Sequence, residues 1–134
     1  IESGKYAMEF QKHNLGNTTL YSVATPGLVP LIEEGKMSEA VQLAKEYIDN
    51  ESVRVGEVDT VVLGCTHYTR LKSDLRAGYK NELNILSQDE IIPSKLELYL
   101  SNHTEIESRL SKEGTREIKL TKKREDYLNF LQSN

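Results

Sequence analysis

The sequence is poor in cysteine and histidine, and it lacks a long hydrophobic run. Its 134 residues include one cysteine and three histidines. A single cysteine excludes an internal disulfide framework and is typical of a reducing cytosol, so we expect a cytoplasmic protein. Two of the three histidines, His13 and His103, lie in a poor context for metal ligands, so we expect no metal. No apolar run approaches the roughly 20 residues needed to span a bilayer, so we expect no membrane partner.

Positive charge is also scarce, since 17 basic residues stand against 21 acidic ones and the net charge is −4. A domain that binds nucleic acid is ordinarily basic, so we expect no nucleic-acid partner. The length suffices for one domain with a core or for part of a larger domain. The chain begins at Ile1, directly in a helical pattern, which predicts a piece cut from a longer polypeptide.

Hydrophobic periodicity predicts strands that alternate with helices. β-branched and apolar runs predict strands over residues 18–24, 58–63, 83–86 and 117–120. Apolar residues at helical spacing predict helices over residues 5–14, 38–50, 69–78, 89–100 and 124–131. Residues 25–35 contain two prolines and two glycines and are predicted to form a loop, and residues 101–115 a mobile connection. The alternation predicts an α/β fold with a mainly parallel sheet flanked by helices.

The stretch VVLGCTHYTRL ends a predicted strand with Cys65, Thr66 and His67. In parallel α/β sheets, functional groups gather at the carboxyl ends of the strands. A helix N-terminus lowers the pKa of a thiol, so a cysteine placed there can act as a nucleophile or a general base. Thr66 offers a hydroxyl and an N–H group to a carboxylate, and His67 can transfer a proton. The alternatives are a small filler at a tight turn beside a surface histidine, or a Cys–His acyl-transfer site.

A second candidate segment follows the strand predicted over residues 18–24. This segment contains two adjacent carboxylates, Glu33 and Glu34. If the two predicted strands are neighbours, both segments face one cleft, because the carboxyl ends of parallel strands meet at the same edge of a sheet.

The string LGCTHYT closely resembles LGCTHYP, the signature around the second catalytic cysteine of glutamate racemase. ATPGLVPLIEEG resembles the family's loop of the form A-C-P-x-F-V-P-L-V-E-x-G. Further resemblance lies in the segments IESGKY, LSQDEIIPSKL and REIKLTKKREDYLNFLQ, and residues 101–115 are the least similar. Thr25 stands where the family often has a cysteine. Thr69 stands where it has a proline, which predicts a looser turn after His67.

The resemblance implies a cofactor-independent racemase of the aspartate/glutamate racemase superfamily, built from two α/β domains with the active site between them. In that family two cysteines face each other across the substrate, and one removes the α-proton while the other returns a proton to the opposite face. By residue-wise comparison, Cys65 is one of the pair, Thr66 binds substrate, and His67 assists Cys65. Glu33 is the acidic residue near the substrate amino group and His67, and Glu34 is its adjacent alternative.

The family's first half carries an Asp-Ser pair and the other cysteine, and neither is among these residues. The resemblance therefore implies the C-terminal portion of a glutamate racemase, inactive alone, whose partner is the missing N-terminal half. Residues 1–82 are expected to be the second, inserted domain that carries the Cys-Thr-His loop, and residues 83–134 a return segment that completes the first domain.

The implied role is the supply of D-glutamate for peptidoglycan synthesis in the cytoplasm. The resemblance is compatible with a homodimer, since family members pair in more than one arrangement. Two other interpretations stay open. One is a racemase of the same superfamily acting on aspartate or another amino acid, and the other is a non-catalytic fragment that binds a ligand or partner.

Overall fold

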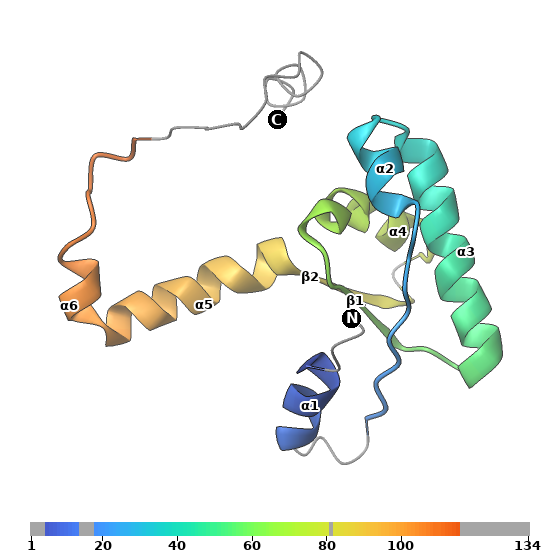
Figure 1. Cartoon of the computed structure of the whole chain (residues 1–134), viewed down its shortest axis with the longest axis horizontal. Helices are drawn as coiled ribbons and strands as arrows, with labels where there is room; N and C mark the ends of the chain where they lie inside the picture. The colour runs from blue at the N-terminus through green and yellow to red at the C-terminus, as the bar shows by residue number, and fades with distance from the viewer. Residues whose placement is uncertain (1–4, 14–17, 81, 116–134) are drawn as a thin grey trace. The chain divides into compact units, whose positions relative to one another are not determined.

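The computed structural model describes residues 5–13, 18–80 and 82–115, which fall into two compact units, Ile1–Leu98 and Tyr99–Asn134. Figure 1 shows the elements, and α5 (Gln88–Asn102) crosses from the first unit to the second. The elements before α5 are α1 (Lys5–Lys12), α2 (Leu28–Glu33), α3 (Met37–Val55), β1 (Thr60–Leu63), the 3₁₀ helix η1 (Thr66–Leu71), α4 (Lys72–Gly78) and β2 (Asn84–Ser87). The second unit contains the end of α5 and α6 (Thr104–Glu107). Among the described residues, every helix is too short or too polar to cross a bilayer.

β1 and β2 form a parallel two-stranded sheet in the described part of the chain. Thr60 lies opposite Asn84, and Leu63 lies opposite Ser87. The prediction of an α/β fold with parallel strands and flanking helices is therefore confirmed for these residues. The expected domain boundary between residues 82 and 83 directly precedes β2, which pairs with β1 across it. The two-domain division stays a prediction.

Two predicted elements are wrong. Residues 18–24 form no strand, because a β-prone run needs a partner for its backbone groups and none pairs with it among the described residues. The loop predicted over residues 25–35 contains the helix α2. Pro30 is the third residue of α2, where an N–H group has no acceptor within the helix, so proline is tolerated there.

The remaining helices follow the predicted order with shifted bounds. α3 is longer than the predicted helix over residues 38–50, and the helix predicted over residues 69–78 is divided into η1 and α4. Residues 101–115, predicted to be a mobile connection, contain the end of α5 and all of α6. The strand and helix predicted over residues 117–120 and 124–131 lie outside the described residues.

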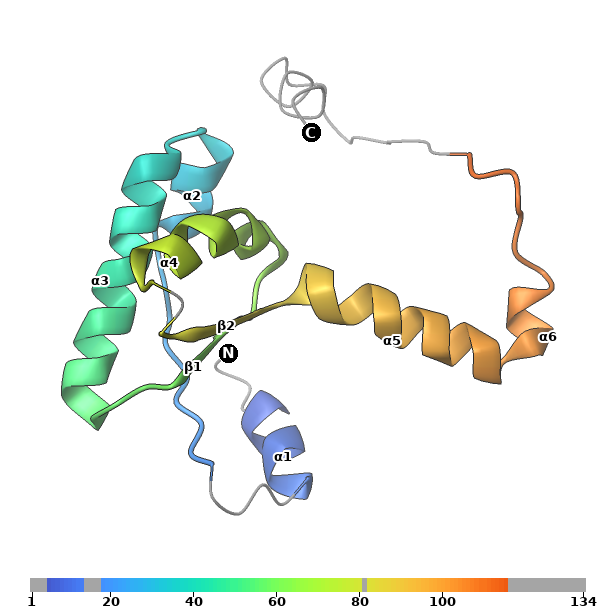
Figure 2. The same ribbon diagram turned by 180° about the vertical axis from the view of Figure 1, so that it is seen from behind.

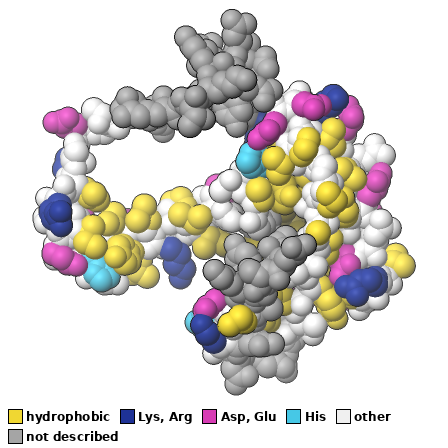
Figure 3. All heavy atoms as spheres, in the orientation of Figure 1, with side chains coloured by type: hydrophobic (Ala, Val, Ile, Leu, Met, Phe, Trp, Pro, Cys, Tyr) yellow, Lys and Arg dark blue, Asp and Glu magenta, His cyan; other side chains and the backbone are white. Residues whose placement is uncertain are grey.

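The core of the first unit lies where α2, α3, η1 and α4 meet the sheet, as Figures 1 and 2 show. Leu63 of β1 and Ile85 of β2 point into this core, and Val62 on the opposite face of β1 is 59% exposed. Large hydrophobic side chains also remain exposed along α5 (Figure 3). The buried apolar residues are Leu28, Ile32, Ala40, Ala44, Leu63, Leu71, Leu75, Leu83 and Ile85. The helices that pack in this core, α2, α3, η1 and α4, therefore lie on one face of the sheet.

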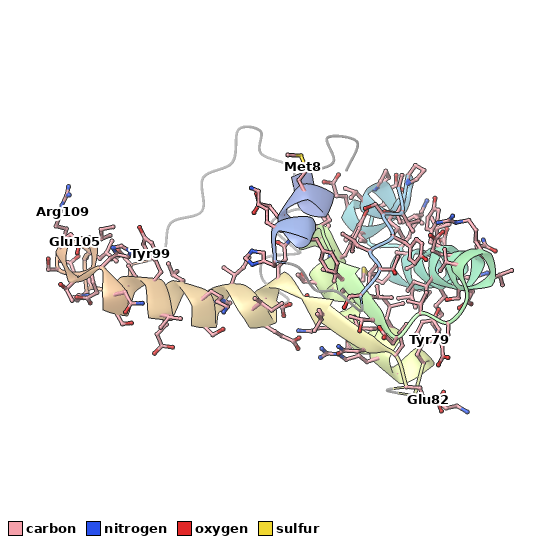
Figure 4. All side chains as sticks on the ribbon, turned by 90° about the horizontal axis from the view of Figure 1, so that it is seen from below. Met8, Tyr79, Glu82, Tyr99, Glu105 and Arg109 are labelled. Atoms are coloured by element: carbon pink, nitrogen blue, oxygen red, sulfur yellow. The ribbon has the colours of Figure 1, made fainter. Side chains whose placement is uncertain are left out.

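Tyr79, directly after α4, ties this helix to α3 (Figure 4). Its hydroxyl donates a hydrogen bond to the carboxylate of Asp49 at 2.7 Å. Burial, together with the nearby carboxylate, raises the pKa of Tyr79 well above its ordinary value. The bond therefore persists throughout the neutral range and holds α4, and with it η1, in place.

Ion pairs connect α4 to the first turn of α5. Lys72 Nζ lies 2.5 Å from Asp89 Oδ2 and 3.1 Å from Glu90 Oε1. Arg76 donates to the two carboxylate oxygens of Glu90 at 2.8 and 2.9 Å. Hydrogen bonds from Arg76 and Lys72 hold the pKa of Glu90 at about 2. The cluster therefore holds the first turn of α5 next to α4, the helix that follows η1.

We expect these ion pairs to make the stability of the first unit fall in acid. The pKa of Glu90 lies below its ordinary value of 4.5, so its stabilisation is present above about pH 4.5 and is lost as the pH falls toward about 2. Glu90→Gln should lower the urea midpoint at neutral pH and flatten its fall in acid, as measured by circular dichroism. Glu97→Gln, on the exposed surface of the same helix, is the control. An unchanged pH dependence in Glu90→Gln would contradict this assignment.

Candidate active site

Cys65 lies between the end of β1 and the start of η1. Its backbone is extended, with φ −125° and ψ 139°, and it occupies the N-cap position of η1. The backbone N–H of Tyr68 donates to the carbonyl of Cys65 at 3.0 Å, which closes the first turn. The thiol is free and partly buried, so it lies at the end of the strand and remains accessible from solvent.

His67 lies between the thiol and a carboxylate. Its Nδ1 is 3.6 Å from the sulfur of Cys65, and its Nε2 is 3.3 Å from Oε1 of Glu33 at the end of α2. When Nε2 carries a proton and donates a hydrogen bond to Glu33, Nδ1 is unprotonated and can accept a proton from the thiol. A carboxylate on the far nitrogen also stabilises the imidazolium that then forms. The geometry of the three side chains would allow a proton to move between the sulfur and the imidazole.

The local sequence explains why Glu33 reaches His67. α2 ends directly after Glu33 in a Schellman motif, whose left-handed residue is Gly35 with φ 75°. The motif turns the chain away, so the two adjacent glutamates have different surroundings. Glu34 pairs with Lys36 Nζ at 2.8 Å, whereas Glu33 contacts His67. Of the two alternatives, the structure brings Glu33 to the thiol–imidazole pair.

Thr66 is exposed beside Cys65, and its carbonyl takes part in the turn. The hydroxyl of Thr69 donates to this carbonyl at 2.8 Å. The looser turn expected from a threonine in place of proline is therefore offset by a hydrogen bond that restrains the same residues. Two residues further on, Leu71 is 1% exposed and anchors the end of η1 in the core.

The sequence pattern predicts no role for Tyr68, although this residue directly follows His67. Its hydroxyl lies 2.6 Å from the hydroxyl of Thr25, which is 43 residues earlier in the chain. A tyrosine within a run of polar residues at a strand end was the one available signal. Within the described residues, no group of three or more cysteine, histidine, aspartate or glutamate side chains is arranged to hold a metal ion.

We expect Glu33→Gln to slow the alkylation of Cys65 by iodoacetamide several-fold at neutral pH. The amide keeps the size of the side chain but removes the charge that stabilises an imidazolium opposite a thiolate. Because the sequence has one cysteine, loss of the free thiol reports on Cys65 directly. Glu34→Gln is the matched control and should react at the unsubstituted rate. Equal rates for Glu33→Gln and the unsubstituted chain would show that Glu33 has no such effect.

The chain is similar to curated glutamate racemases from several bacteria. It is 39% identical over 92 residues to that of Persephonella marina, which covers 67% of this chain and 34% of that protein. It is 36% identical over 104 residues to that of a Sulfurihydrogenibium species, with 76% and 36% covered. It is 30% identical over 105 residues to that of Aquifex pyrophilus, with 77% and 36% covered. No family model matches the chain, and no solved structure matches it.

The chain spans about a third of the length of these curated relatives. Any stretch that covers two thirds of this chain includes its middle, so Cys65 and His67 lie within each of these three alignments. The alignments show that the chain is a relative of the glutamate racemases and corresponds to a part of them.

Proposed function

We propose that this chain supplies one of the two proton-transferring cysteines of a glutamate racemase, an isomerase that interconverts L- and D-glutamate. The observation that carries the proposal is that His67 lies between the thiol of Cys65 and the carboxylate of Glu33 in a relative of these enzymes. Cys65 follows the carboxyl end of a parallel strand, where α/β sheets commonly bind ligands. D-Glutamate formed in this way would serve peptidoglycan synthesis in the cytoplasm.

The proposed reaction inverts the α-carbon without a cofactor. A thiolate takes the α-proton, the electron pair of the broken C–H bond stays on the carbon, and a thiol on the opposite face donates its proton to that carbon. The α-hydrogen of an amino acid is a poor acid, so its removal needs a positioned base and stabilisation of the developing negative charge. Cys65 serves one face of the substrate, and the two sulfurs exchange roles when the direction reverses.

The neighbours of Cys65 have distinct roles in this scheme. His67 receives the thiol proton through Nδ1 and returns it, and Glu33 holds the ring in the required orientation. Thr66 is exposed at the same turn, where its hydroxyl and N–H group can hold the substrate carboxylate. All four residues come from two short segments, the end of α2 and the start of η1.

The second cysteine must come from outside these residues. The 134 residues contain one cysteine, and the relatives extend over about three times the matched length. We infer that this chain corresponds to the C-terminal portion of such an enzyme and that the N-terminal portion supplies the opposite face of the site.

The 134-residue chain alone is therefore expected to form no D-glutamate from L-glutamate, as measured by chiral chromatography. The productive counterpart is a chimera in which the matching segment of this chain replaces its equivalent in the Persephonella marina enzyme. This chimera is expected to form D-glutamate and to turn over glutamate faster than aspartate.

Each outcome bears on a different part of the proposal. A folded chimera without turnover would refute the proposed function. Faster turnover of aspartate would identify a racemase of different specificity. Sustained racemisation by the chain alone would refute the need for a second cysteine.

A further inference from the structure

A hydrogen bond between two hydroxyl groups joins the segments that build the candidate site. Thr25 Oγ1 lies 2.6 Å from the hydroxyl of Tyr68, and the pair is partly buried. The carbonyl of Thr25 accepts the N–H of Leu28, the first residue of α2, at 3.4 Å. Tyr68 belongs to η1 and is the immediate neighbour of His67. The bond therefore connects the start of α2 to the turn that carries the imidazole.

The same two elements meet again at the opposite end of α2. There, Glu33 contacts His67 at 3.3 Å. α2 is six residues long, so its two ends are about 9 Å apart, at a rise of about 1.5 Å per residue. One contact is made just before α2 and the other at its last residue, and together they restrict the orientation of η1 against α2 more than either contact alone would.

The segment before α2 is itself held firmly. The hydroxyl of Tyr47 in α3 donates to the carbonyl of Pro26 at 2.8 Å, and Gly27 takes the left-handed conformation, with φ 92°, that starts α2. Thr25 is therefore attached to a fixed part of the first unit and can serve as an anchor for Tyr68. Such a bond at 2.6 Å lies within the short range typical of O–H···O pairs.

We propose that Thr25 and Tyr68 are positioning residues that hold His67 between Cys65 and Glu33. Both act through the imidazole, because the hydroxyl of Tyr68 bonds to Thr25 and not to the sulfur. A threonine suits this role, because its hydroxyl bonds more strongly to a phenol than a thiol at the same position would. The inference rests on the proposed function, since it concerns the position of the proposed base.

The test is the rate of alkylation of Cys65 in the 134-residue chain by iodoacetamide, followed from about pH 5 to about pH 9. Thr25→Val and Tyr68→Phe remove the same bond from opposite sides, and each should lower the rate constant at neutral pH about twofold to tenfold. Their combination should be no slower than the slower single variant, because the bond can be lost once only. If only one of the two single variants keeps the native circular dichroism spectrum, that variant alone suffices to test the effect of losing the bond.

Matched variants separate positioning from a general contribution to stability. Thr25→Ser keeps the hydroxyl and should restore the unsubstituted rate, and Tyr99→Phe changes a tyrosine of the second unit and should leave the rate unaltered. In a His67→Asn background, Thr25→Val should have no further effect. An unsubstituted rate in Thr25→Val, or equal slowing with and without His67, would overturn the proposal. Because the alkylation assay uses no substrate, its result is independent of racemisation. Thr25→Val can leave the alkylation rate unchanged while the chimera racemises glutamate, and it can slow alkylation while the chimera does not.

Discussion

Replacing Cys65 by serine is expected to reduce racemisation of glutamate by the chimera about a hundredfold to ten-thousandfold, in both directions. A hydroxyl is a far weaker acid than a thiol, so near neutral pH it is not available as the anionic base. The imidazole of His67, whose Nδ1 lies 3.6 Å from the sulfur, stays in place but faces a hydroxyl that is too weak an acid to give it a proton. The measurement is the rate of D-glutamate formation from L-glutamate and of the reverse reaction.

A neighbouring serine provides the control for this substitution. Ser73 is exposed on α4, and Ser73→Ala should leave the rate unchanged while altering a side chain of similar size. A Cys65→Ser chimera that retains more than about a tenth of the activity would show that the sulfur does not act as an acid or base.

Replacing Leu71 by alanine is expected to lower the free energy of unfolding by about 2–5 kcal/mol. Leu71 is 1% exposed at the end of η1, where it packs with the buried residues of α2 and α4. The truncation removes apolar contacts and leaves a cavity beneath the turn that carries Cys65 and His67. Urea unfolding followed by circular dichroism measures the loss.

A leucine on the surface serves as the matched control for this truncation. Leu96 on α5 is 52% exposed, so Leu96→Ala should change the free energy of unfolding by less than about 0.5 kcal/mol. Similar losses in the two variants would contradict the position of the core between η1, α2 and α4.

The parts of the fold that were predictable are those whose sequence signal is complete within a short window. The continuous apolar run before Gly64 predicts β1, because the pattern is complete within the run itself. Residues 18–24 are also rich in β-branched and aromatic residues, yet they form no strand, because pairing depends on a neighbour that the local sequence does not show. The prolines and glycines of residues 25–35 predict a loop where α2 forms, because proline breaks helices in general but is tolerated in a first turn, where Pro30 lies.

The candidate site divides in the same way. Cys65, Thr66 and His67 are adjacent in the sequence, so their grouping could be read from it directly. The contact between His67 and Glu33, and the bond between Tyr68 and Thr25, join residues more than 30 positions apart. Both contacts depend on how α2 packs against η1, about which periodicity and propensity carry no information. The resemblance to glutamate racemases predicted that Glu33 lies near His67, whereas nothing in the sequence predicted the bond between Tyr68 and Thr25.

The measurement that tests the central claim most directly is deuterium incorporation at the α-carbon of each enantiomer of glutamate by the Cys65→Ser chimera. In deuterated water, nuclear magnetic resonance follows the loss of the α-proton signal from L-glutamate and D-glutamate separately. If Cys65 serves one face, exchange should be lost for one enantiomer and retained for the other, whose α-proton faces the remaining cysteine. Equal exchange of both enantiomers would contradict the assignment of Cys65 as the base for a single face.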